Sequence, residues 1–299
     1  MARVPTLKTS NGVVPAFEIV EPKEHSIPFV FCSPHSGRDY PVDLMSETRL
    51  CRDSIRRSED LFVDQLFALA TEHGAPVLRA RFPRAYLDVN REPFELDPNM
   101  FDATLPSFVN TSSLRVAGGL GTIPRIVAEN EEIYHSRLSV PDGLRRIEDI
   151  YRPFHAALER LLYRTRDRFG FAILIDCHSM PSSVRALPGG RRPDMVIGDR
   201  YGTSASSRFV SMATAHLSAF GFDVARNKPY AGGYITENYG RPPIDLHAMQ
   251  IEINRGLYAD ERAFRPHEGF VRLRHQLGQF VERFAADVEA DYSRPAAAE

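Results

Sequence analysis

The sequence predicts a layered α/β fold with a mostly parallel or mixed central sheet. Short apolar runs end abruptly in polar segments rich in Gly or Pro, as residues 29–32 do before Ser33-Pro34-His35. Continuous apolarity over four to eight residues is typical of strands that are covered on both faces. Segments with helical spacing lie between these runs, and such alternation indicates layers of helix and sheet.

Five runs carry this strand pattern. The first, residues 29–32, is uniformly apolar, and residues 171–175 repeat it before Asp176-Cys177-His178. The other three runs are shorter or less uniform. The predicted strands are residues 29–32, 85–90, 171–175, 195–198 and 249–253.

Four longer segments have apolar residues three or four positions apart, which is the spacing of one helix face. Residues 144–169 show it best, with Ile147, Ile150 and Phe154 on one stripe and Gly170 as a stop signal. The predicted helices are residues 58–73, 144–169, 204–220 and 264–292.

The chain of 299 residues could form one large domain or two small ones. We expect a single domain over residues 1–294, followed by a disordered tail at 295–299. Residues 92–123 have several Pro and Gly residues and weak periodicity. A loop of this length inside a compact domain is usually functional or disordered, so we expect an excursion over the site rather than a domain boundary.

The composition is that of a soluble globular protein, with 43% hydrophobic and 25% charged residues. A chain of this length buries enough surface to fold without disulfides or other staples. The net charge of −2 gives no excess of cations to attract nucleic acid or an anionic membrane. No run approaches the roughly 20 apolar residues of a membrane span. We therefore expect neither nucleic-acid nor membrane partners.

The cysteines and the N-terminal residues are informative about the cellular compartment of the protein. The first residues contain no apolar stretch of the kind found in secretory signals. Cys32, Cys51 and Cys177 are odd in number and far apart, which argues against a disulfide framework and for a reducing cytoplasm. Cys32 and Cys177 sit in apolar runs and are interpreted as small buried hydrophobic residues.

Polar residues follow three of the predicted strands directly. These residues are His35, Asn90-Arg91 and His178, while Glu252 lies within the run 249–253. In open α/β sheets, ligands bind at the carboxyl ends of the strands. The distribution predicts an active site at this edge.

The two histidines each follow an apolar run and precede a serine. A single histidine there would more often be a hydrogen-bonded structural residue, but two suit a catalytic zinc site of two His and one carboxylate. Glu59 or Asp60 could supply the carboxylate. Acidic residues in a first helical turn are expected from the macrodipole alone, so the residues leave this choice open.

Arg91 and Glu252 suggest two further roles. An Arg fork pairs bidentately with a carboxylate and is a usual anchor for one, although Arg91 could instead pair with a surface acid. Glu252 lies between Ile251 and Ile253, and burial would raise its pKa, as suits a general base beside a metal-bound water. Alternatively, Glu252 is the partner of a buried arginine such as Arg255 or Arg84.

Competing motifs are incomplete. Residues 118–121 are rich in Gly, but no Lys-Ser/Thr pair follows as in a phosphate loop. The nucleophile elbow G-x-S-x-G of serine hydrolases is absent from the sequence. Cys177 and His178 would point to opposite faces of a strand, which disfavours a Cys–His nucleophile.

Four motifs together resemble the N-formylglutamate amidohydrolases. They are residues 33–37 (SPHSG), 88–91 (DVNR), 176–179 (DCHS) and 250–252 (QIE). Residues 119–125 and 230–235 look like the same family, so the resemblance runs from about residue 30 to 260 in order. More distantly, the second and third motifs look like those of zinc carboxypeptidases and aspartoacylase-type deacylases.

The resemblance implies a three-layer α/β/α fold of the zinc exopeptidase type and a site for one zinc ion. It implies that His35, His178 and an acidic residue hold the zinc, and it favours Asp60 over Glu59. Carboxypeptidases place their acidic ligand three residues after the first His, where this chain has Arg38. This departure makes the third ligand the point to examine.

The resemblance also assigns roles around the zinc. It makes Asn90 and Arg91 the anchor of the substrate carboxylate and Glu252 the base that activates water. Arg91 or Arg84 would stabilise the oxyanion, and Arg125 and Tyr234 would close over the substrate. The implied reaction is hydrolysis of N-formyl-L-glutamate, a small molecule, to glutamate and formate.

Two alternatives to this reaction remain. One is a metallo-carboxypeptidase or deacylase acting on another N-acyl amino acid or small peptide. The other is a non-catalytic protein that binds small anions in the same cleft. The sequence indicates no oligomeric state.

Overall fold

The computed structural model describes residues 4–128, 131–184, 186–188, 190 and 192–292. The predicted tail at 295–299 lies outside these residues. The chain divides into two compact units whose segments alternate along the sequence. Unit 1 consists of Met1–Ile19, Ser33–Leu61 and Leu78–Arg160, and unit 2 of Val20–Cys32, Phe62–Val77 and Leu161–Glu299. A single domain over residues 1–294 stays a prediction.

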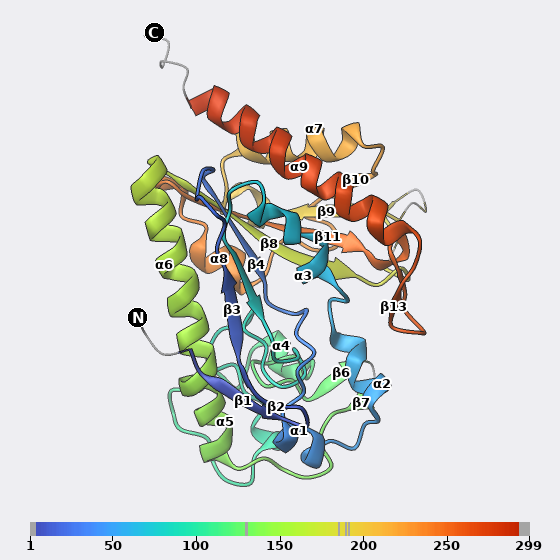
Figure 1. Cartoon of the computed structure of the whole chain (residues 1–299). Helices are drawn as coiled ribbons and strands as arrows, with labels where there is room; N and C mark the ends of the chain where they lie inside the picture. The colour runs from blue at the N-terminus through green and yellow to red at the C-terminus, as the bar shows by residue number, and fades with distance from the viewer. Residues whose placement is uncertain (1–3, 129–130, 185, 189, 191, 293–299) are drawn as a thin grey trace. The chain divides into compact units, whose positions relative to one another are not determined.

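The described residues contain a seven-stranded sheet of order β10-β9-β11-β8-β4-β5-β3 (Figure 1). β8 pairs in parallel with β4 and with β11, and β9 pairs in parallel with β10 but antiparallel with β11. The sheet is therefore mixed and mostly parallel, as predicted. Its strands are β3 (Phe17–Val20), β4 (Phe29–Ser33), β5 (Val77–Ala80), β8 (Ala172–Met180), β9 (Met195–Gly198), β10 (Val224–Arg226) and β11 (Leu246–Asn254).

Four of the five predicted strands are confirmed, and β8 and β11 extend beyond the predicted residues 171–175 and 249–253. Every residue of β4, β8 and β9 is buried. This is the environment that their continuous apolarity predicts, because both faces of these strands are covered.

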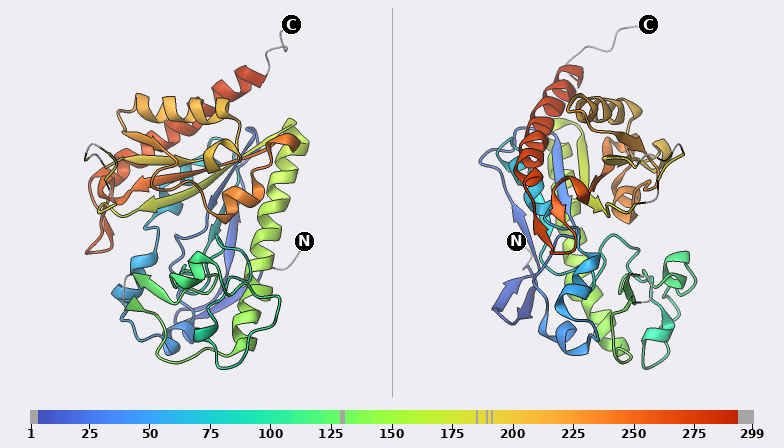
Figure 2. Two further views of the ribbon diagram at one scale, coloured as in Figure 1. Left: turned by 180° about the vertical axis from the view of Figure 1, so that it is seen from behind. Right: turned by 90° about the vertical axis from the view of Figure 1, so that its right-hand side faces the viewer.

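Helices cover both faces of the sheet in unit 2 (Figures 1 and 2). On one face, Phe284 of α9 (Gly269–Tyr292) contacts Phe29 of β4, with ring centroids 5.0 Å apart, and α7 (Ser207–Ala219) lies along α9. On the other face, α8 (Tyr234–Tyr239) contacts β8 and β11. The three layers α/β/α are confirmed.

The register of β8 and β11 determines which side chains share a face. Glu252 lies directly across from His178, and Gln250 lies across from Asp176. Side chains alternate along a strand, so these four project to one face of the sheet. It is the face that α8 covers, because Thr236 Oγ1 of α8 lies 3.4 Å from Asp176 Oδ2.

Three predicted helices are present with shifted ends. The segment predicted at 144–169 begins earlier, with α5 (Val140–Arg146), continues through a π-helical turn (Ile147–Tyr151) and ends with α6 (Arg152–Phe169). Gly170 follows with φ of +85°, a conformation that Gly adopts without a steric penalty. α7 and α9 correspond to the predictions at 204–220 and 264–292.

The prediction of one helix over residues 58–73 is wrong. The segment forms a 3-10 turn (Arg56–Ser58), the short helix α3 (Val63–Leu66) and a second 3-10 turn (Ala68–Thr71). Phe62 has φ of +58° and so interrupts the helical path. Just before it, the amide of Asp60 donates to His35 O at 3.0 Å, a tertiary hydrogen bond that local spacing could not reveal.

The prediction of a strand over residues 85–90 is also wrong, because this segment consists of turns. The amide of Tyr86 donates to Pro83 O, and the amide of Asn90 donates to Asp88 Oδ1 at 2.9 Å. Asp side chains favour such turns because they accept from the backbone two residues on. The strand of this region is β5, which precedes the predicted one.

Unit 1 has mostly short elements. Residues 92–123 form a long irregular stretch with only a 3-10 turn and α4 in it, and its position over the site stays a prediction. The elements of this unit besides those above are β1 (Thr6–Thr9), β2 (Gly12–Pro15), α1 (Val42–Glu47), α2 (Arg52–Ile55), η3 (Pro98–Met100), α4 (Leu114–Ala117), β6 (Ile126–Ala128) and β7 (Glu131–Glu132).

The remaining elements of unit 2 are short turns and strand pairs, namely η5 (Arg200–Gly202), η6 (Pro242–Ile244), η7 (Arg255–Leu257), β12 (Ala259–Asp260) and β13 (Arg265–Pro266). The three cysteines are free thiols, of which Cys32 and Cys177 are buried, as predicted. None of the described helices has the length and apolarity that crossing a bilayer requires.

Candidate metal centre

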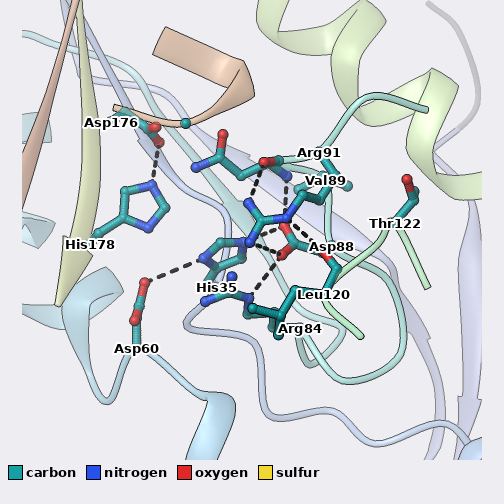
Figure 3. A network of polar contacts seen from close by, with 12 residues as sticks. His35, Asp60, Arg84, Asp88, Val89, Arg91, Leu120, Thr122, Asp176 and His178 are labelled. Atoms are coloured by element: carbon teal, nitrogen blue, oxygen red, sulfur yellow. Dashed lines mark hydrogen bonds and ion pairs between the residues drawn. The ribbon is translucent and has the colours of Figure 1, made fainter. Parts of the chain in front are cut away.

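His35 lies in the loop that follows β4 and is 2% exposed. Its Nε2 lies 2.8 Å from Asp88 Oδ1, and its Nδ1 lies 3.4 Å from Asp60 Oδ2 (Figure 3). A proton on Nε2 that is donated to Asp88 leaves the lone pair on Nδ1, because a neutral imidazole carries one proton. Metal-binding histidines are commonly oriented by a carboxylate in this manner.

Glu59 and Asp60, the two candidates for the third ligand, have different surroundings. Glu59 Oε1 accepts from the Tyr40 hydroxyl at 2.6 Å, and both Glu59 oxygens accept from Arg56 Nε. Burial and the neighbouring Glu59 raise the pKa of Tyr40 far above its usual range, so Tyr40 remains a donor. Glu59 thus belongs to a structural network, whereas Asp60 faces His35.

His178 projects from β8 and is 3% exposed. Its Nε2 lies 2.9 Å from Asp176 Oδ1, and the two residues are two positions apart on one strand face (Figure 3). Unlike the contact of His35 with Asp88, this one is an ion-pair distance only, because Asp176 Oδ1 is buried without a hydrogen-bond partner among the described residues. It therefore does not determine which ring nitrogen of His178 carries the proton.

One ligand atom each from His35, Asp60 and His178 lies within 4.8 Å of the other two, and all three residues are buried. Donor atoms on a tetrahedral zinc are about 3.3 Å apart, since zinc–nitrogen distances are about 2.0–2.1 Å. The His35–Asp60 separation of 3.4 Å is close to this value. Two His and one carboxylate form a common set of catalytic zinc ligands, so the residues present fit this metal.

Asp88 lies beside His35 and forms ion pairs with two arginines. Its Oδ2 accepts from Arg84 Nε at 2.9 Å and lies 3.5 Å from Arg91 Nη2. Burial alone would raise the pKa of Asp88, but Arg84, Arg91 and His35 together lower it well below its usual value. Asp88 is therefore ionised and can hold His35.

Asp88 and Asp176 are functional candidates that sequence reasoning did not single out, although both stand in the motifs of the resemblance. The signal that could have found Asp176 is its spacing, because Asp176 and His178 are two residues apart on a predicted strand. No comparable signal exists for Asp88, whose partner His35 lies far away in sequence.

Asn90 and Arg91 follow Asp88 in the same turn. Arg91 Nε donates to Leu120 O and Nη1 donates to Asn90 O, both at 2.8 Å. Leu120 belongs to the long loop of residues 92–123. Burial lowers the pKa of Arg91 to about 10, against the opposing influence of Asp88, so the guanidinium keeps its charge at neutral pH.

Glu252 is 7% exposed and lies on β11 across from His178. Gln250 Nε2 donates to Glu252 Oε1 at 2.8 Å. Of the two arginines weighed as structural partners, Arg84 contacts Asp88, and Arg255 Nε donates to Ser179 Oγ at 3.0 Å. The register of β8 and β11 places Glu252 beside a histidine of the candidate metal group.

Arg125 and Tyr234 were the two residues expected to close over a substrate. Arg125 Nε lies 3.0 Å from Asp97 Oδ2, and its Nη1 lies 3.2 Å from Glu132 Oε1. Tyr234 is the first residue of α8 and is partly buried. Arg125 is thus engaged with carboxylates of its own unit.

Cys177 is unsuited to nucleophilic chemistry. Burial, reinforced by Asp176, raises the pKa of its thiol well above the usual value. It also alternates with His178 along β8 and so points to the opposite face.

Comparisons with known proteins agree with this geometry. A profile of the N-formylglutamate amidohydrolase family matches residues 27–259. The chain belongs to this family. It is 30% identical to N-formylglutamate deformylase of Pseudomonas putida over 79% of this chain and 83% of the relative. All four motifs from His35 to Glu252 lie in the matched range.

Solved structures place the N-formylglutamate amidohydrolase family in the same fold. The crystal structure of N-formylglutamate amidohydrolase from Ralstonia eutropha JMP134 matches with a TM-score of 0.86 and 33% identity, over 93% of this chain and all of that one. The gene product Atu2144 from Agrobacterium tumefaciens, at 18% identity, shares the fold with a TM-score of 0.66 over 92% of this chain and 96% of that one.

Proposed function

We propose that this chain is a zinc-dependent hydrolase that converts N-formyl-L-glutamate and water to L-glutamate and formate. Its relatives in the N-formylglutamate amidohydrolase family are named for this substrate. The observation that carries the proposal is the group of His35, Asp60 and His178 with Glu252 across from His178. A metal ligand set and a carboxylate side by side suit metal-assisted hydrolysis of an amide with a general base.

In this proposal Nδ1 of His35, a ring nitrogen of His178 and a carboxylate oxygen of Asp60 would hold one zinc ion. When bound, zinc lowers the pKa of water and polarises a carbonyl group. Asp88 keeps the imidazole of His35 in the tautomer that leaves Nδ1 unprotonated, and Asp176 lies beside Nε2 of His178.

Glu252 moves the proton. Its carboxylate takes a proton from the attacking water as the oxygen–carbon bond to the formyl group forms. It then returns this proton to the amide nitrogen as the carbon–nitrogen bond breaks. Glutamate leaves with a neutral amine, and the water oxygen leaves in formic acid with the second water proton. Formic acid then gives this proton to the amine, which yields formate and an ammonium group, and Glu252 is restored as a carboxylate.

The cationic cluster of Arg84 and Arg91 would hold and polarise the substrate. With Asp88 between them, the two guanidinium groups keep a formal net charge of +1, which favours an anionic substrate. Asn90 and Arg91 would bind a substrate carboxylate, and Arg84 or Arg91 would stabilise the developing oxyanion. Arg125 and Tyr234 are proposed to enclose the substrate.

The substrate is tested by measuring turnover of N-formyl-, N-acetyl- and N-succinyl-L-glutamate by zinc-loaded protein. We expect kcat/KM to be highest for the formyl compound. Higher turnover of another acyl group would make the chain a deacylase of that class. Absence of turnover of any N-acyl amino acid would contradict the hydrolase proposal and favour a small-anion binder.

The role of Glu252 is tested by Glu252→Gln, with the exposed Glu282→Gln of α9 as the control. We expect kcat to fall about 100- to 10,000-fold in Glu252→Gln, the usual contribution of a general base, and to stay unchanged in the control. If Glu252 is only a structural partner of an arginine, the variant unfolds more easily but keeps its kcat.

The location follows as part of the proposal. The three free thiols support a reducing compartment, the cytoplasm, because disulfides are rare there.

A further inference from the structure

Gln250 has no part in the proposed reaction, yet its side chain bridges the proposed base and the backbone. It is 4% exposed and lies on the same face of β11 as Glu252. Its Nε2 donates to Glu252 Oε1 at 2.8 Å, and its Oε1 accepts from the amide of Gly233 at 2.9 Å. A buried amide requires such partners, and here each end has one.

The two contacts fix the direction of the Gln250 amide. A backbone N–H can only donate, so the oxygen of Gln250 must face Gly233. The NH2 group then faces Glu252, where an ionised carboxylate accepts a charge-assisted hydrogen bond. A flipped amide would lose both interactions.

Gly233 is itself firmly placed. Gly198, the last residue of β9, approaches the segment before Gly233 so closely that a Cβ atom would lie 2.6 Å from the carbonyl carbon of Ala231. The amide of Arg200 donates to Ala231 O at 2.8 Å, and Arg200 Nη1 donates to Gly232 O at 3.4 Å. The segment that precedes α8 is therefore held against β9 and Arg200 by close packing and two hydrogen bonds.

We propose that Gln250 is a positioning residue, which holds the Glu252 carboxylate at a fixed place by tying it to Gly233 at the start of α8. The proposal rests on the role of Glu252 as the base. A Glu side chain rotates about three bonds, and proton transfer requires its oxygen within hydrogen-bond reach of the water. A displacement of about 1 Å can reduce a rate about 100-fold.

The test compares Gln250→Met and Gln250→Glu in zinc-loaded protein. Met keeps the length but removes both hydrogen bonds, while Glu keeps the acceptor for Gly233 and removes the donor to Glu252. We expect kcat to fall about 10- to 100-fold in both variants, with KM within about threefold and zinc content unchanged. Gln276→Met on α9 is the matched control and should behave as the wild type.

A double-mutant cycle with Glu252→Gln separates positioning from a general structural role. If Gln250 acts through Glu252, Gln250→Met lowers the kcat of Glu252→Gln less than about twofold. Additive losses, or a kcat of either single variant within twofold of the wild type, would overturn the proposal. Full activity of Glu252→Gln itself would instead show that the base is another residue.

Discussion

At the candidate metal centre, each of the two histidines lies beside a carboxylate. Asp88 is hydrogen-bonded to Nε2 of His35, which leaves Nδ1 for a metal, and Asp176 Oδ1 lies 2.9 Å from Nε2 of His178. An imidazole fixed in one tautomer and orientation loses less freedom when it binds a metal. As a metal ligand, Asp60 would add one negative charge to two neutral imidazoles.

The third ligand can be tested by two isosteric variants of adjacent residues. Asp60→Asn should lower zinc affinity sharply, because a neutral amide oxygen is a weaker ligand than a carboxylate. Glu59→Gln should keep zinc affinity but lower the free energy of unfolding by about 1–3 kcal/mol, because its contacts with Tyr40 and Arg56 are weakened. Zinc affinity is measured by competition with a chelator. Equal zinc affinity of the two variants would contradict the assignment.

His155 predicts a pH dependence of stability in the acid range. Its Nε2 lies 2.8 Å from Val89 O, and burial lowers its pKa to about 4, despite the opposing hydrogen bond. When unfolded it titrates near 6.5, so the unfolded chain binds more protons between these values. The stability associated with neutral His155 is complete above about pH 6.5 and is lost as the pH falls toward 4.

Denaturation at pH 7.5 and 4.5 measures this effect. We expect His155 to account for at most about 3 kcal/mol of the stability loss. The contribution is smaller if water reaches part of the ring, because solvent then screens the charge. His155→Gln does not titrate, so the difference in stability between the two pH values should shrink by this amount. An unchanged difference would show that His155 is not responsible.

At the scale of elements, the ends of strands and the turns after them place the functional side chains. β8 presents Asp176 and His178 on one face, and β11 presents Gln250 and Glu252 on the same face. α8 then covers this face and contacts both strands. The positions of these side chains therefore depend on strand register, and a slip by one residue would turn all of them away.

The loop after β4 depends on Gly37. A Cβ atom at this position would lie 2.0 Å from the carbonyl oxygen of Phe82, so the backbone would have to move. We expect Gly37→Ala to reduce the free energy of unfolding by more than about 2 kcal/mol and to weaken zinc binding, because His35 is two residues away.

The matched control is Gly118→Ala at the end of α4. There the nearest atom to an added Cβ is Leu114 O at 3.4 Å, and φ is −79°, so alanine should be tolerated. Urea denaturation and chelator competition measure both variants. Wild-type behaviour of Gly37→Ala would mean that the loop adapts freely.

For the whole molecule, zinc should stabilise a fold that forms without it. The core has large buried side chains, including Phe29, Phe31, Phe280 and Phe284, so folding does not depend on the metal. Zinc at 100 times its Kd should add about 2.7 kcal/mol, which for a chain of this length raises Tm by about 4 °C.

This prediction is checked by thermal unfolding with zinc and with a chelator. His178→Ala should show no rise in Tm with zinc, whereas His267→Ala, an exposed histidine of another segment, should show the full rise. A chelated protein that is unfolded at 25 °C would contradict a metal-independent core.

The sequence predicted some segments correctly and others wrongly, and the difference has a physical reason. Strands β4, β8, β9 and β11 are buried on both faces. Their apolar residues therefore form continuous runs, from which the strands can be predicted. The predictions for residues 58–73 and 85–90 were wrong because hydrogen bonds to residues far away in sequence determine the backbone path of these segments. Asp60 bonds to His35 O, and the amide of Asp88 bonds to Thr122 O.

The sequence by itself determined the layered α/β class, the position of His35 after a buried strand, and the family motifs. His178, which was expected to follow its strand, lies within β8. The choice of Asp60 over Glu59 rested on resemblance alone, and only the tertiary structure shows Glu59 occupied by Tyr40 and Arg56. The tertiary structure also decided the neighbours of Asp88 and the link from Gly233 through Gln250 to Glu252. The reason is that periodicity encodes which residues are buried, whereas contacts between distant residues arise only when the strands and turns take their register.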